Sequence, residues 1–138
     1  MLKIPKTIHD QMLAHATAEA PMECCGLLAG RNSTVDTIYR MTNADHSPVR
    51  YMIDPKEQFA AIKEMRTKEI EMLAIYHSHP QTEAYPSATD IRLAYYPDAV
   101  YIIVSLENPD RPVVNAYRIV ENKISTEELE ILGPKNPA

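Results

Sequence analysis

Residues 76–90 of this 138-residue chain are YHSHPQTEAYPSATD. The stretch follows a short apolar run that predicts a strand, so His77 and His79 stand at the end of that strand. Side chains two residues apart on a strand point to the same side, and both imidazoles therefore face one way. Asp90 follows in the first turn of a helix expected over residues 87–96. Two imidazoles and a carboxylate provide three ligands and an open fourth position, as in a catalytic zinc site.

Parts of this pattern have simpler explanations. Ser87 follows a proline and stands three residues before Asp90, which is a common helix start with Ser87 as the N-cap and the carboxylate near the positive end of the helix dipole. A single strand histidine is more often a buried core residue than a ligand. Two same-side histidines together with a carboxylate favour a metal site. The same three ligand types also form the facial triad of non-haem iron oxygenases, so iron is an alternative metal.

The rest of the chain predicts helices and strands that alternate along the sequence. Helices are expected over residues 6–20, from residue 54 onward and over 87–96, and strands over 24–29, 34–41, 72–76, 99–106, 113–120 and 123–132. The first two strands are expected to form a hairpin with a turn at 30–33, and the near-continuous apolar run 99–106 is expected to be a central strand covered on both faces. In the last segment, Ser125-x-x-Glu128 could equally cap a helical turn. In the second helix, Asp54 is the expected N-cap and Glu57 the capping-box carboxylate. Phe59, Ile62 and Met65 form its expected buried side. This order predicts an α/β fold in which helices pack against a mixed central sheet.

The composition limits the number of domains and the classes of function. Hydrophobic residues make up 45% of the chain and charged residues 24%, which predicts a single domain over residues 1–138. The net charge of −5 and the lack of a basic run argue against nucleic-acid binding. The first residues lack the apolar stretch of a signal peptide, and no apolar run approaches the ~18 residues that span a bilayer. We therefore expect a cytoplasmic protein with no membrane segment.

The remaining cysteines and histidines receive no chemical role at this stage. Cys24 and Cys25 are the only cysteines, and neighbours on a strand point to opposite faces, so a disulfide between them is not expected. Both are expected to be small core residues in a reducing compartment. His9, His15 and His46 have no partner at ligand spacing and are expected on the surface.

The motif His77-x-His79-Pro80, followed after six residues by Ser87-x-x-Asp90 and preceded by Glu23, resembles that of the JAMM (MPN-plus, Mov34/MPN/PAD-1) zinc metalloproteases. The segment PMECCGLLAG, residues 21–30, is similar to the family's strand that bears a glutamate. The resemblance covers essentially the whole chain. It implies the MPN fold, which is similar to the cytidine deaminase architecture.

The resemblance also implies roles for single residues. His77, His79 and Asp90 match the family's ligands for one Zn²⁺ per chain. Zinc lowers the pKa of bound water from 15.7 toward ~7. Glu23 matches the general acid/base, since one carboxylate can accept a proton from water and return it to the leaving amine. Ser87 matches the hydroxyl that helps to stabilise the oxyanion.

Members of this family hydrolyse peptide or isopeptide bonds, often just beyond the C-terminal Gly-Gly of ubiquitin or a ubiquitin-like protein. No more than residues 95–98 separate the third helix from the next strand, which leaves no room for a long insertion and implies the compact prokaryotic branch. The expected partner is the tail of a ubiquitin-fold sulfur-carrier protein, from which a residue such as cysteine is released. Tyr85, Tyr95 and Tyr96 are candidates to line a groove for that tail.

Besides the iron oxygenase, three alternatives remain open at this point. The chain could be an isopeptidase that removes small ubiquitin-like modifiers, or a non-catalytic MPN binding module. A thiol enzyme that uses Cys24 or Cys25 would need a nearby histidine to activate it. His77 or His79 could serve only if the metal site were given up.

Overall fold

The structure is a computed structural model in which residues 1–133 are described. The last five residues of the predicted domain, 134–138, lie outside the described residues, and the extent of that domain stays a prediction. No helix in the described part of the chain is long and apolar enough to cross a membrane.

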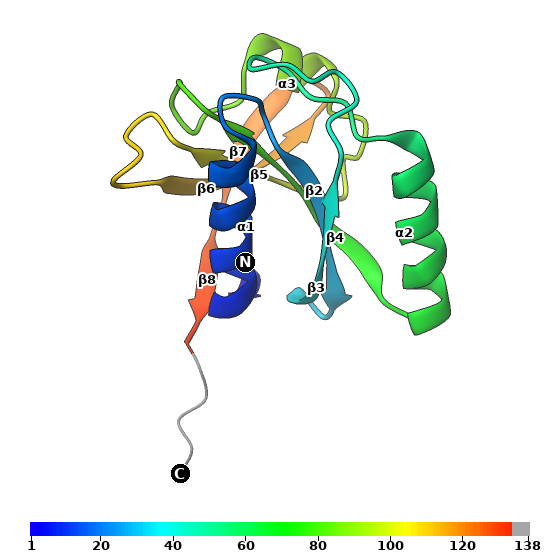
Figure 1. Ribbon diagram of the computed structural model, residues 1–138. Coiled ribbons are helices and arrows are strands. Elements are labelled where there is room, and N and C mark those ends of the chain that lie inside the picture. The colour runs from blue at the N-terminus through cyan, green and yellow to red at the C-terminus, as the bar shows by residue number, and fades with distance from the viewer. Residues whose placement is uncertain (134–138) are drawn as a thin grey trace.

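The described chain folds into one mixed sheet with helices packed on it (Figure 1). The helices are α1 (Lys6–Glu19), α2 (Pro55–Lys68) and α3 (Ala88–Arg92). The strands are β1 (Leu2–Pro5), β2 (Cys25–Arg31), β3 (Thr34–Met41), β4 (Glu71–His79), β5 (Val100–Ser105), β6 (Val113–Val120), β7 (Lys123–Glu127) and β8 (Leu129–Leu132). Their order in the sheet is β7-β6-β5-β4-β2-β3-β1-β8. Strands β4 and β5 run parallel, whereas β2 pairs antiparallel with both β3 and β4.

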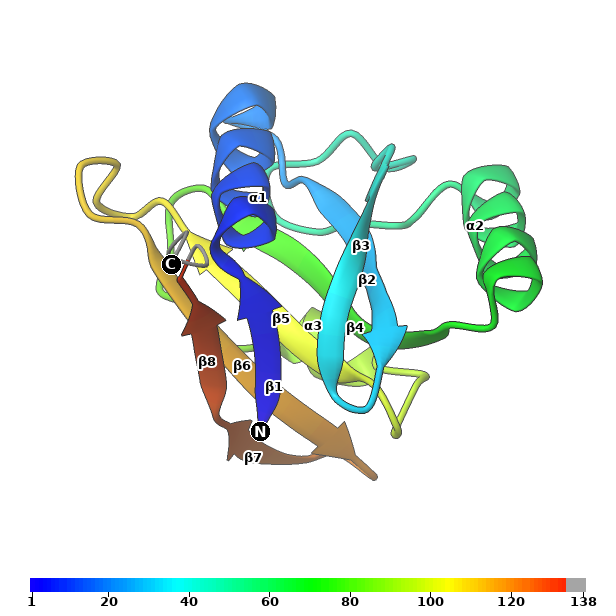
Figure 2. The ribbon, with the colours of Figure 1, turned by 90° about the horizontal axis from the view of Figure 1, so that it is seen from below.

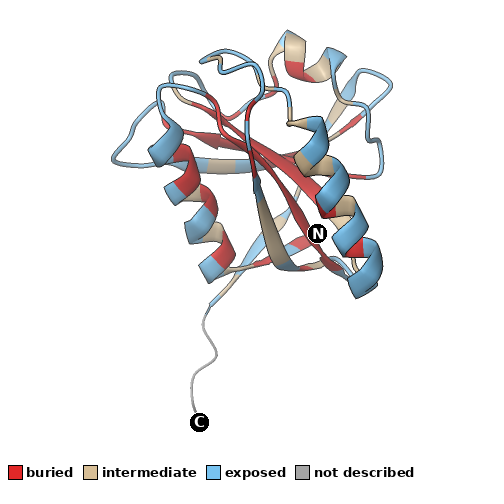
Figure 3. Cartoon of the chain, turned by 45° about the vertical axis from the view of Figure 1, so that its right-hand side comes forward, coloured by how far each residue is buried: buried red, intermediate tan, exposed pale blue. Residues whose placement is uncertain are grey.

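The two larger hydrophobic cores lie on the two faces of the sheet. On one face, Ile8, Met12 and Ala16 of α1 pack with β-strand residues that include Tyr76. On the other, Ala61 and Met65 of α2 pack with a different set of strand residues. Figures 2 and 3 show α1 and α2 standing apart, with buried residues on the helix sides that face the strands. All six residues of β5 are buried, which confirms the predicted central strand covered on both faces.

The local predictions around two turns are confirmed. Strands β2 and β3 form the expected hairpin, and Asn32 and Ser33 turn it with positive φ angles of 52° and 61°. Gly30 belongs to β2 and lies at a bulge. A Cβ atom there would overlap the carbonyl of Thr34, so close packing explains this glycine. At the start of α2, Asp54 accepts hydrogen bonds from the backbone N–H groups of residues 56 and 57.

Two predictions about α2 were wrong. Glu57 does not complete a capping box, because the Asp54 N–H already donates to the carbonyl of Thr42. The Glu57 carboxylate instead accepts bonds from the N–H and hydroxyl of Thr42, at 2.6 and 2.7 Å. These bonds hold the face of Glu57, Ala61 and Met65 toward the sheet. Phe59 consequently faces solvent and is 72% exposed.

Three further elements differ from the prediction. Strand β1 was not predicted; it is four residues long and pairs in parallel with β3 and β8. Helix α3 ends at Arg92, well before the expected residue 96. Residues 123–132 form two strands, β7 and β8, where one was expected. Short strands whose partners are distant in sequence carry little pattern of their own.

The cysteines follow the prediction, whereas one histidine does not. Cys24 and Cys25 are both free and buried, one in each of the two cores. His15 was expected on the surface, but it lies on the inner side of α1 and is buried. Its Nδ1 atom is 2.7 Å from the Tyr76 hydroxyl, a partner that the sequence does not reveal. His46 is exposed as expected.

Gly26 provides a test of this packing. A Cβ atom on Gly26 would overlap the ring of Tyr76, which cannot move away freely because His15 holds its hydroxyl. We expect Gly26→Ala to lower the free energy of unfolding by about 1–3 kcal/mol, the usual cost of overpacking a core. Urea denaturation followed by circular dichroism measures this. Gly133→Ala is the matched control, since its Cβ meets no atom within 4 Å; equal midpoints for the two variants would contradict the expectation.

Candidate metal centre

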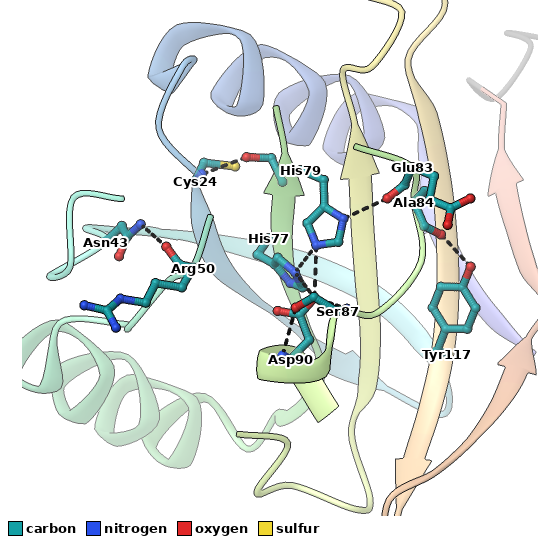
Figure 4. A network of polar contacts seen from close by, with 11 residues as sticks. Cys24, Asn43, Arg50, His77, His79, Glu83, Ala84, Ser87, Asp90 and Tyr117 are labelled. Carbon is teal, nitrogen blue, oxygen red and sulfur yellow. Dashed lines mark hydrogen bonds and ion pairs between the residues drawn. The ribbon is translucent and has the colours of Figure 1, made fainter. Parts of the chain in front are cut away.

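The three predicted ligand residues meet at the end of β4 (Figure 4). His77 and His79 lie on the same side of this strand, and Asp90 reaches them from α3. The two Nε2 atoms are 3.1 Å apart, and the Asp90 Oδ2 atom is 3.1 Å from the first and 3.0 Å from the second. All three residues are buried. The structure thus brings together the residues that the spacing selected.

The triangle of ligand atoms fits a small tetrahedral ion. Zinc binds imidazole nitrogen and carboxylate oxygen at about 2.0–2.2 Å, so two of its tetrahedral ligands stand about 3.3–3.5 Å apart. The observed separations of 3.0–3.1 Å are only slightly shorter. Two imidazole nitrogens and one carboxylate oxygen are also ligand types that zinc accepts. The residues present therefore fit a zinc ion held by three protein atoms.

The ring of His79 is oriented by a backbone carbonyl. Its Nδ1 donates to the Glu83 carbonyl at 2.7 Å, which leaves Nε2 unprotonated and directed at the centre in the neutral ring. The loop that carries this carbonyl is itself held on both sides. Ser105 donates to the carbonyl of Thr82 at 2.6 Å, and the Tyr117 hydroxyl donates to that of Ala84.

In the metal-free protein, the environment of the centre favours the metal-binding forms of Asp90 and His77, whereas it favours the protonated form of His79. Burial alone would raise the pKa of Asp90, but hydrogen bonds from His77, His79 and the Ser87 N–H lower it well below its usual range. Burial lowers the pKa of His77. Burial also acts to lower the pKa of His79, yet the bonds to Asp90 and the Glu83 carbonyl outweigh it and the net shift is upward. Asp90 is thus ionised and His77 neutral at pH 7.

Glu23 lies next to this triangle because of strand register. Cys25 pairs with His77 across β2 and β4, and Cys24 exchanges backbone and side-chain bonds with Ser78. Continued two residues beyond Cys25, this register places Glu23 opposite His79 and on the same face of the sheet, and the charges of His79 and Asp90 act on its carboxyl. Its side chain is 3% exposed.

The environment of Glu23 suits proton transfer. Burial raises the pKa of its carboxyl from 4.5 to about 8, with the charge of His79 opposing this shift and that of Asp90 adding to it. Among the described residues, its Oε1 atom has no hydrogen-bond partner. A carboxyl with a pKa near neutrality both accepts and returns a proton readily.

Ser87 caps α3, and this does not conflict with a second role. Its Oγ accepts from the Asp90 N–H at 3.0 Å, while its own N–H donates to Asp90 Oδ2 at 2.9 Å. The N-cap role that the sequence predicts for Ser87 is therefore confirmed. The hydroxyl hydrogen is not used in these bonds, so it remains able to donate to a developing oxyanion.

Two nearby residues were missed by the sequence reasoning. Tyr51 stacks on the ring of His77, with ring centroids 4.4 Å apart and an interplanar angle of 22°. Asn43 is buried and donates to the carbonyl of Glu23. Both lie in a segment without periodic hydrophobicity, and the sequence carries no signal for either contact.

The predicted tyrosine groove divides into two cavities. One, of about 350 Å³, is mainly apolar and is lined by Tyr51, Tyr95, Tyr96 and Tyr101 among others. Tyr51 stands between this cavity and the metal centre, because it lines the cavity and stacks on His77. Tyr85 instead lines a separate cavity of about 450 Å³.

The cysteines are poorly suited to act as nucleophiles. Burial raises the pKa of the Cys24 thiol to about 12 and also raises that of Cys25. Reactive cysteines are accessible and have a lowered pKa. The geometry therefore argues against the thiol-enzyme alternative.

Comparison with known proteins identifies the class. Residues 5–120 match the Prok-JAB family, the prokaryotic homologs of the JAB domain. The chain belongs to this family of compact prokaryotic JAMM/MPN proteins, and the observed mixed sheet is its fold.

Individual relatives are similar over most of the chain. The CysO-cysteine peptidase of Mycobacterium tuberculosis is 39% identical over 96% of this chain and 92% of its own. The desampylase of Haloferax volcanii is 33% identical over 75% of this chain and 80% of its own. The solution structure of protein DSY2949 from Desulfitobacterium hafniense has a TM-score of 0.89 and 40% identity, and the match covers 97% of this chain and 94% of that one. These matches confirm the expected family and its class, hydrolytic metallopeptidases.

The buried Glu23 leads to a prediction about stability and pH. In the folded, metal-free protein its carboxyl keeps a proton up to about pH 8, whereas in the unfolded chain it loses that proton near 4.5. Between these pH values the unfolded state binds fewer protons, so this group lowers stability as pH rises. We expect Glu23→Gln to stabilise the metal-free protein at pH 8 by on the order of 2 kcal/mol more than at pH 4, after allowance for solvent screening.

Urea unfolding of chelator-treated protein at several pH values measures this difference. Glu130→Gln, which changes an exposed carboxylate, is the control and should follow the wild type. If Glu23→Gln also runs parallel to the wild type across the pH range, the carboxyl is not buried as described.

Proposed function

We propose that this chain is a zinc-dependent peptidase. It hydrolyses the bond that follows the C-terminal Gly-Gly of a ubiquitin-fold sulfur-carrier protein and releases a residue such as cysteine. The observation that carries the proposal is the convergence of His77, His79 and Asp90 with a buried, unpartnered carboxylate oxygen of Glu23 beside them. The similarity to a CysO-cysteine peptidase over nearly the full length of both chains supports the choice of substrate.

In this proposal His77, His79 and Asp90 hold one Zn²⁺, which when bound supplies a Lewis acid that polarises the scissile carbonyl and acidifies water. Glu23 takes a proton from the attacking water as the new C–O bond forms. It then returns the proton to the leaving nitrogen as the C–N bond breaks. Ser87 donates its hydroxyl hydrogen to the carbonyl oxygen while negative charge develops there.

The apolar cavity beside His77 suits the tail of the carrier. An extended C-terminal tail that ends in Gly-Gly is narrow, and the walls formed by Tyr51, Tyr95 and Tyr96 offer flat rings along which it can lie. The short connection between α3 and β5 itself contributes Tyr95 and Tyr96 to this wall.

A second candidate is removal of small ubiquitin-like modifiers from protein lysines. It is favoured by the match to a desampylase over 80% of that protein. The same residues would perform this reaction, because only the leaving amine differs.

The metal is tested by elemental analysis of purified protein. We expect about one zinc per chain in the wild type and loss of zinc in His79→Ala, because that substitution removes one of three ligands. Iron in place of zinc would favour the oxygenase alternative. Absence of metal after zinc is offered to chelated and dialysed protein would contradict the proposed centre.

The reaction is tested with a carrier extended by one residue beyond Gly-Gly. Mass spectrometry should show release of that residue by the wild type, and Glu23→Gln should lower kcat at least about 100-fold while zinc stays bound, since general acid/base catalysis contributes ~10²–10⁴. The control is Glu130→Gln. Retained turnover in Glu23→Gln would remove this residue from the mechanism.

Assays with an isopeptide-linked conjugate in parallel separate the two candidate substrates. Cleavage of the extended carrier with a higher kcat/KM supports the first, and the reverse order supports the second. Tight binding of the carrier by the wild type, without any product, would instead indicate a binding module.

A further inference from the structure

Asn43 is a buried amide at which all four hydrogen-bonding capacities are used. Its Nδ2 donates to the carbonyls of Glu23 and Arg50, each at 3.1 Å. Its Oδ1 accepts from the N–H groups of Asp45 and Met52, each at 3.0 Å. Every partner is a backbone group, and an amide side chain offers no more than two donors and two acceptor positions. Figure 4 shows the side chain directed at Arg50.

These bonds join the segment of residues 43–52 to Glu23. Asn43 donates to the carbonyl of Glu23, and the N–H of Glu23 donates to the carbonyl of Ser47 at 2.9 Å. Both polar groups of this residue's backbone are thus bound by one segment. The Oε1 atom of its side chain has no partner among the described residues, so the side chain does not fix its own position.

The same amide fixes the backbone on both sides of Tyr51. Asn43 bonds to the residue before it, Arg50, and to the residue after it, Met52. Tyr51 is the residue that stacks on His77. The segment is anchored in turn by Glu57 of α2, whose carboxylate holds Thr42.

We infer that Asn43 is a positioning residue that holds Glu23 beside His79 and Tyr51 against His77. The inference rests on the proposed function, in which Glu23 transfers the proton. Asn43 touches neither substrate nor metal ligand, and it acts by restricting the backbone from which two site residues project. Misplacement of a reacting group by about 1 Å typically costs ~100-fold in rate.

Asn43→Asp removes the donor group of this side chain and keeps its acceptor oxygen, so the two can be tested separately. The new side chain keeps oxygens that accept from the N–H groups of Asp45 and Met52, so two of the four bonds that anchor the segment remain. It loses the Nδ2 group that donates to the carbonyls of Glu23 and Arg50. We expect kcat for the extended carrier to fall about 10–100-fold, while KM changes less than twofold and the zinc content stays at the wild-type value.

Asn108→Asp is the matched control. Asn108 also accepts a bond through Oδ1 from the N–H two residues later, that of Asp110, at 3.1 Å, but in an exposed turn. The substitution adds the same charge and should leave kcat unchanged. An equal fall in both variants would assign the effect to charge and overturn the inference, as would wild-type kcat in Asn43→Asp.

Amide hydrogen exchange in Asn43→Ala is a second test of the inference. This neutral variant removes all four bonds, and the amides of Glu23 and Met52 should exchange faster than in the wild type, by at least about tenfold, with zinc bound. Exchange equal to the wild type overturns the inference whether or not the protein is active. If the wild type cleaves no carrier at all, the proposed function fails, and faster exchange at these two amides alone still supports the positioning contact.

Discussion

The antiparallel pairing between β2 and β4 places the groups of the metal centre relative to one another. Cys25 lies opposite His77, and Ser78 bonds to Cys24 through both its N–H and its hydroxyl. Glu23 therefore stands opposite His79. Because side chains alternate between faces, a shift of one residue in this register would turn Glu23 away from the ligands. The geometry of the proposed site thus depends on a pairing deep in the sheet.

The centre is costly for the protein to maintain. Glu23, His77, His79 and Asp90 are all buried, where ionised groups are stable only when they are paired or coordinated. Asp90 is satisfied by both imidazoles and by the cap of α3. Glu23 is less well satisfied, and burial shifts its carboxyl toward the protonated form. Such local conflicts with stability are typical of functional sites.

Irregular segments, together with the strands, position the side chains of the site. In the loop after β4, the Glu83 carbonyl accepts a hydrogen bond that orients the ring of His79. Hydrogen bonds from Ser105 and Tyr117 hold this loop in place. The segment after β3 brings Tyr51 onto His77 and binds the backbone of Glu23 through Asn43. In both cases side chains hold backbone groups, so the loops are ordered without regular secondary structure. Precision at the site comes from these contacts as much as from the sheet.

The sequence by itself determined the features whose causes are local. The spacing of His77, His79 and Asp90 depends on strand alternation and on the first turn of the next helix, and the cap of α2 lies within four residues. Tertiary structure alone decided the rest, including the exposure of Phe59, the burial of His15 and the hydrogen bonds of Asn43. Their partners lie at other places in the chain: Tyr76 is 61 residues from His15, and Glu23 is 20 from Asn43. No short-range pattern encodes which distant group a polar side chain meets, because only the packed sheet brings the two together.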